Sequence, residues 1–95
     1  MTDIEIAKGT IDGHSVCFCK DGKSFTLDGM GLSPLMRMIN EGKDLHGYSA
    51  ADVVVGKAAA MLFKKLGVVS VHGKLMSETG ADFLEKSGIT FTYDT

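Results

Sequence analysis

The stretch Ala51–Ala60, with the sequence ADVVVGKAAA, decides the fold. We expect a weakly patterned strand over Leu45–Ala51 to end where this stretch begins. A helix then begins at Asp52 or Val53 and runs to about Leu66. Alanine, methionine, leucine and phenylalanine fill the middle of this helix, so it is apolar nearly all round. It should therefore be the most buried helix of the chain.

Two strands and one helix are expected after it. Val68–Leu75 is rich in valine and leucine, as in a buried strand. Ser77 can cap a last helix that ends at Gly88. In Ile89–Tyr93, apolar residues alternate with threonine, as in a strand. Strands joined by a helix are parallel with right-handed crossovers, so the last three strands should be parallel.

Two further helices are expected before Ala51–Ala60. Thr2 and Glu5 have the spacing of a capping box, in which each side chain bonds to the backbone N–H of the other residue, and predict a short first helix. Ser33 is expected to cap a second helix, with Pro34 at its first position, where the missing N–H costs nothing.

A hairpin is the clearest local prediction. Ser15–Lys20 and Ser24–Leu27 flank Asp21-Gly22, a pair that favours the positive φ angles of a two-residue turn. Both faces of these strands are apolar, so we expect both to be covered. The predicted fold is α/β with three α/β/α layers. Its mixed five-stranded sheet combines the N-terminal hairpin with three parallel strands.

Length and composition limit the classes of protein. Ninety-five residues predict one domain, residues 1–95. A content of 44% hydrophobic residues excludes intrinsic disorder, and a net charge of −2 argues against nucleic acid or an anionic membrane as partner. The apolar run Val53–Phe63 is too short to span a bilayer. The acidic N-terminus has no apolar signal region, and Cys17 and Cys19 are poorly placed for a disulfide, so we expect a cytoplasmic protein.

The sequence resembles an uncharacterised microbial family of unknown function. The resemblance rests mainly on Ala51–Ala60, with support from Lys20–Lys23, Ser33–Leu35 and Gly67–Val69, and it covers about Asp3 to Tyr93. It implies a cytidine-deaminase-like fold and no particular activity. Members of that family continue beyond the last strand into an extension with an Asn-Arg pair and a Cys-Pro segment. This sequence stops before such an extension, so we expect any function located there to be absent or to come from elsewhere.

The zinc motifs of working deaminases are missing at the matching positions. Those enzymes need a His or Cys followed by Ala-Glu at one helix start and Pro-Cys-x-x-Cys at the next. Here Val55–Ala58 and Met76–Gly80 contain neither His nor Cys. We therefore expect no metal site, no cofactor and no zinc-dependent deamination. Cys17 and Cys19 are interpreted as small buried hydrophobes, and the three histidines as surface or structural residues.

Five residues remain as candidates for a ligand site. Ligands of open α/β sheets bind at the carboxyl ends of strands, beside helix N-termini that attract anions. Asp52, Gly56 and Lys57 are expected at one such place, and Ser77 and Glu78 at the equivalent place on the last helix. A purely structural interpretation stands beside this one. In it, Asp52 caps the helix, Gly56 allows close contact between helix and sheet, and Lys57 is a solvated side chain. Ser77 and Glu78 are then ordinary residues of a helix start.

Three functions follow from these observations. The first is a non-catalytic domain that binds a small anionic or nucleotide-like molecule at the helix N-termini. The second is a structural or regulatory module that acts through self-association as a homo-oligomer. The third is an enzyme with unrelated chemistry around Asp52 and Lys57, which would need a perturbed lysine pKa.

Overall fold

The computed structural model describes residues 1–95 and contains a five-stranded mixed sheet with four helices. The elements follow the chain in the order α1 (Asp3–Thr10), β1 (Val16–Lys20), β2 (Lys23–Leu27), α2 (Ser33–Asn40), β3 (Ser49–Val55), α3 (Lys57–Leu66), β4 (Ser70–Met76), α4 (Glu78–Lys86) and β5 (Thr90–Tyr93). The strand order in the sheet is β2-β1-β3-β4-β5. β1 is antiparallel to β2 and β3, whereas β3, β4 and β5 are parallel. The predicted hairpin and three parallel strands are confirmed.

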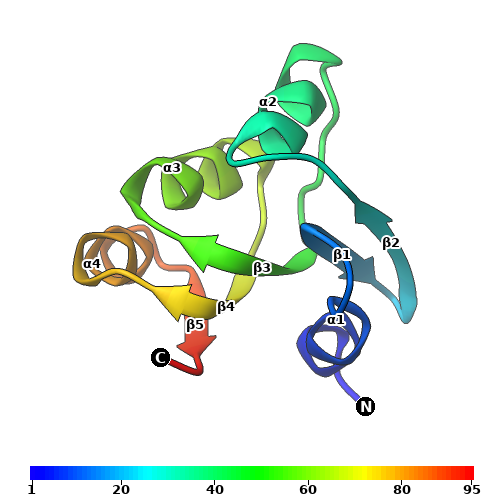
Figure 1. Cartoon of the computed structure of the whole chain (residues 1–95), viewed down its shortest axis with the longest axis horizontal. Helices are drawn as coiled ribbons and strands as arrows, with labels where there is room; N and C mark the ends of the chain where they lie inside the picture. Colours follow the sequence, from blue (N-terminus) through cyan, green and yellow to red (C-terminus); the bar gives the residue numbers. More distant parts are fainter.

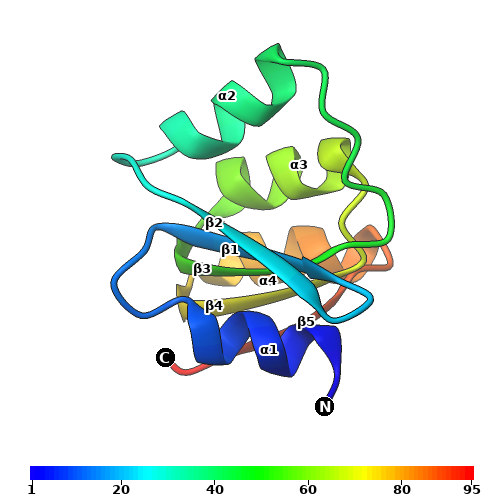
Figure 2. The same ribbon diagram turned by 90° about the vertical axis from the view of Figure 1, so that its right-hand side faces the viewer.

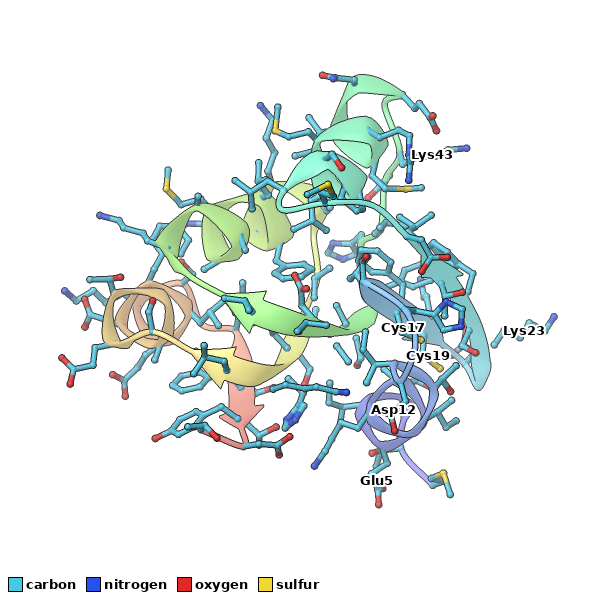
Figure 3. The ribbon with its side chains drawn as sticks, in the orientation of Figure 1. Glu5, Asp12, Cys17, Cys19, Lys23 and Lys43 are labelled. Atoms are coloured by element: carbon cyan, nitrogen blue, oxygen red, sulfur yellow. The ribbon has the colours of Figure 1, made fainter.

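The sheet lies between two unequal helical layers (Figures 1 and 2). Helices α2, α3 and α4 cover one face and form a core of sixteen buried residues that includes Phe18, Phe63 and Leu84. Helix α1 alone covers the other face. Its small core contains Cys17 and Cys19, which lie between β1 and α1 as free, fully buried thiols (Figure 3). The three-layer architecture and the buried cysteines agree with the predictions.

The two local motifs at the N-terminus also form as predicted. Thr2 and Glu5 make both hydrogen bonds of a capping box at the start of α1. In the hairpin turn, Asp21 has φ 53° and Gly22 has φ 79°, the positive values that a two-residue turn requires. Asp3 links the two motifs, because its carboxylate accepts the N–H groups of both turn residues at 3.0 and 2.9 Å. These hydrogen bonds hold the pKa of Asp3 below its usual value.

The predicted boundary between strand and helix at residues 51–60 is wrong. Strand β3 ends at Val55 and α3 begins at Lys57, four or five residues later than expected. Asp52 is paired on both sides, with Val16 of β1 and Gly73 of β4, and the strand continues beside β4, where Val54 lies opposite Leu75. Three consecutive valines favour this pleated, paired state over a helix.

Three smaller expectations also need correction. Leu32 rather than Ser33 occupies the N-cap position of α2, and it makes no side-chain capping bond. Helix α3 is not apolar all round: it buries one side and exposes Met61 and both lysines of its last turn. Strand β2 lies at the sheet edge and is at most half-buried, so only β1 of the hairpin is covered on both faces. None of the helices has the length and apolar character needed to cross a lipid bilayer.

Candidate functional site

A cavity of about 450 Å³ opens at the carboxyl end of β3. The end of β3, the start of α3, the segment before β1 and the segment before α2 enclose it, and these parts lie on the same side of the molecule (Figure 2). Most of the residues that line the cavity are apolar residues or glycines. The lining residues are His14, Ser15, Gly29, Gly31, Leu32, Asp52, Val53, Val54, Gly56, Ala58 and Ala59.

The two helices that begin at this cavity are the two that lack a side-chain cap. Gly56 is the N-cap residue of α3, and Leu32 is that of α2; both line the cavity. The first helical hydrogen bond of α3 runs from the N–H of Ala60 to the carbonyl of Gly56 at 3.0 Å. The N–H groups of the preceding turn are therefore available to a bound group. In contrast, Thr2 and Ser77 cap α1 and α4.

Asp52 is the acidic group of the cavity wall. Its carboxylate accepts the N–H of Val53 at 2.7 Å and forms no ion pair with any Lys, Arg or His. Desolvation by the surrounding apolar wall raises the pKa of Asp52 to about 6, although its hydrogen bonds from the Val53 and Val54 amides act in the opposite direction. The cavity therefore contains a carboxyl group that changes charge near neutral pH.

His14 and Ser15 form the wall provided by the segment before β1. The Nδ1 atom of His14 lies 3.1 Å from Oδ1 of Asp28. The hydroxyl of Ser15 donates to the carbonyl of Gly29 at 2.7 Å and accepts the N–H of Gly29 at 3.0 Å. These contacts join the segments before β1 and after β2, so the imidazole is held at the cavity.

The structure separates the five predicted site residues. Asp52 and Gly56 line the cavity, whereas Lys57, Ser77 and Glu78 do not. Ser77 lies close by, because a Cβ added at Gly56 would be 3.9 Å from its hydroxyl, but that hydroxyl is engaged in capping α4. Lys57 and Glu78 are exposed in the first turns of their helices.

Sequence reasoning missed the wall that contains His14, Ser15 and Gly29. The register of the predicted hairpin could have indicated this wall. Val16 pairs with Leu27, so extending the same antiparallel register outward brings residues 14 and 15 beside residues 28 and 29. That extension would have placed a histidine next to the carboxyl end of a neighbouring strand.

Comparison with protein families identifies this chain by its sequence. Residues 8–95 match the model of a domain of unknown function, DUF1893, also described as TM1506. The chain belongs to the DUF1893 family. It is similar to a crystal structure of a DUF1893 family protein (TM1506) from Thermotoga maritima, with 26% identity and a TM-score of 0.85. The similarity covers 97% of this chain but only 64% of the Thermotoga protein. Comparison with curated proteins finds no match.

Two solved deaminase structures of lower sequence identity have a fold similar to that of this chain. The first is a dCMP deaminase from the cyanophage S-TIM5, with a TM-score of 0.63, 14% identity, and coverage of 96% of this chain and 93% of that one. The second is a diaminohydroxyphosphoribosylaminopyrimidine deaminase/5-amino-6-(5-phosphoribosylamino)uracil reductase from Thermotoga maritima, with a TM-score of 0.61 and 17% identity. This match covers 97% of this chain and 34% of that one. The deaminase-like fold predicted from the sequence is confirmed.

The donor groups of this DUF1893 chain do not fit the zinc ion of that fold. Zinc in deaminases needs thiolate and imidazole ligands at the starts of two neighbouring helices. The corresponding starts of α3 and α4 offer Gly56, Lys57, Ser77 and Thr79. No three side chains of His, Cys, Asp or Glu converge elsewhere as a metal site.

Proposed function

We propose that this DUF1893 chain is a zinc-less, non-catalytic domain of the cytoplasm that binds a small anionic or nucleotide-like molecule in the cavity beside α3. The cavity itself is the observation that carries the proposal. Its volume of about 450 Å³ lies in the range of small-molecule sites, and it occupies the carboxyl end of a central strand, where α/β folds bind ligands.

The wall suggests how the parts of such a molecule would be held. Free N–H groups at the start of α3 and the positive charge of Lys57 would attract an anionic group. Gly56 would let that group approach the backbone, because only one atom lies within 4 Å of a Cβ added there. Leu32 and Val54 would contact an apolar ring. Ser77 and Glu78, at the start of α4, would lie beside the ligand, outside the residues that line the cavity.

Calorimetry with AMP, CMP, GMP, UMP and inorganic phosphate tests the proposal. We expect at least one nucleotide to bind, and Lys57→Ala to weaken this binding about twofold to fivefold, as for an exposed charge. Ala58→Gln should abolish binding, because Ala58 lines the cavity and a longer side chain would fill it. Met61→Gln is the matched control, since Met61 is 49% exposed one turn later on α3 and outside the cavity. The absence of binding by every compound, or equal binding by the Ala58→Gln variant, would contradict the proposal.

Self-association is a second candidate function, supported by one exposed pair. Val54 and Leu75 lie opposite each other on β3 and β4, with exposures of 55% and 49%. Light scattering over a range of protein concentrations should detect a dimer, and Leu75→Glu should make it a monomer. A strict monomer at every concentration would exclude this function.

A further inference from the structure

The carboxyl group of Asp52 has an unusual position for a structural residue. It is half-buried in an apolar wall and has no cationic partner, although desolvation of an unpaired carboxylate is costly. Two backbone N–H groups, those of Val53 and Val54, use part of its capacity. A carboxylate has about four acceptor positions, so others remain for a group inside the cavity.

We propose that Asp52 is the recognition residue for a ligand with an amidine- or guanidine-like group, whose N–H donors bind the carboxylate from within the cavity. This inference rests on the proposed function and adds a second group to the same ligand: its anionic part would lie at the start of α3 and its cationic part at Asp52. A planar cation of this type can donate two parallel N–H bonds to one carboxylate. The apolar side chains of Leu32 and Val54 would contact the rest of the molecule.

The other charged groups near the cavity do not provide this partner. His14 is the only other titratable lining residue, and Asp28 already holds its Nδ1 atom. Lys57 lies at the start of α3, outside the lining residues, and forms no ion pair with Asp52. The cation for Asp52 would therefore come from the ligand.

Benzamidine and benzamide are suitable probes, because they have nearly the same shape and differ in charge. NMR titration of the whole chain should show that benzamidine binds about tenfold or more tightly than benzamide at pH 7, with shifts of the Val53 and Val54 amides. Asp52→Asn keeps the shape and an acceptor oxygen, so this variant should fold and should lose the preference for benzamidine.

The pH dependence of benzamidine binding provides a second test of the role of Asp52. Benzamidine stays cationic at neutral and mildly acidic pH, whereas Asp52 becomes protonated as the pH falls through about 6. Its affinity should therefore fall about tenfold between pH 7 and pH 5. His14 is the other ionisable residue that lines the cavity, so His14→Gln is the control, and it should retain the fall in affinity.

The outcomes separate this inference from the proposed function. Equal binding of benzamidine and benzamide, or a benzamidine affinity that is unchanged in Asp52→Asn, overturns the role of Asp52. If a nucleotide still binds in the cavity and Ala58→Gln abolishes that binding, the proposed function stands alone. If neither the nucleotides nor benzamidine binds, both proposals fail.

Discussion

Helices α3 and α4 begin in equivalent places, at the carboxyl ends of neighbouring parallel strands. Only the start of α4 is closed by a side-chain cap. Each helix follows a parallel strand after a single extended residue, Gly56 for α3 and Ser77 for α4. The Ser77 hydroxyl accepts the N–H of Gly80 at 3.0 Å, and Gly80 packs against the backbone of Val55. The start of α3 has no cap and opens into the cavity. The same topology thus gives one helix start that a side chain caps and one without a cap, where we propose that a ligand binds.

Among the variants that compare the two helix starts, Gly80→Ala should have the largest effect on the free energy of unfolding. A Cβ at Gly80 would lie 2.8 Å from the carbonyl oxygen of Val55, and this backbone contact cannot move freely. We expect a loss of about 3 kcal/mol in the free energy of unfolding, measured with urea. Gly56→Ala is the matched control: its nearest contact would be 3.9 Å away, so its cost should be below about 1 kcal/mol. Similar losses in both variants would show that the two starts are equally packed.

Asp52→Asn should increase the free energy of unfolding of the protein by about 2 kcal/mol at pH 7. Burial raises the pKa of Asp52 from 3.8 to about 6, so the folded state favours the protonated carboxyl. This favourable contribution is complete below about pH 4 and is lost as the pH rises through 6. The amide resembles the protonated form, so its advantage should appear above pH 6 and disappear near pH 4. Urea unfolding at the two pH values measures it, and an equal gain at both would contradict the assigned cause.

Ser77→Ala should cost about 1 kcal/mol, because it removes the cap of α4. Thermal or urea unfolding measures this loss. Ser87→Ala, at the other end of the same helix, removes a hydroxyl without a capping bond and should change the free energy of unfolding by less than about 0.5 kcal/mol. Equal effects would mean that the Ser77 bond does not stabilise the helix.

Gly56→Ser should have the smallest effect on stability and a large one on binding. Gly56 has φ −94° and ψ −174°, an extended conformation that serine adopts freely. The new hydroxyl can cap α3 and should add about 0.3 kcal/mol. It would also occupy N–H groups that the proposed ligand uses, so nucleotide affinity should fall in calorimetry. Unchanged affinity would indicate that these groups do not bind the ligand.

The parts of the fold set by local chemistry could be predicted from the sequence. The capping box of Thr2 and Glu5, the Asp21-Gly22 turn and the Ser77 cap each involve residues within a few positions of one another. The end of β3 could not be predicted, because Asp52–Val55 is a strand through its pairing with β4 and, at Asp52, with β1, and that pairing is nonlocal.

The same limit applies to the candidate site. Asp52 and Gly56 were predicted because they are neighbours in the sequence at a strand-to-helix junction. His14 and Gly29 come from the two ends of the hairpin, and only its register brings them to the cavity. Lys57 follows Gly56 directly but, as an exposed residue, lies outside the cavity wall. Sequence proximity could not distinguish the two positions.

Amide NMR during titration with the nucleotide panel tests the binding role of the cavity most directly. The predicted result is that one nucleotide shifts the amides of Val53–Ala59 and Gly29–Leu32, two separate segments that both contribute lining residues to the cavity. The amides of the closed start, Ser77 to Gly80, should shift less. Shifts that are absent, or that centre on the start of α4, would contradict the assignment of the open start of α3 as the binding site.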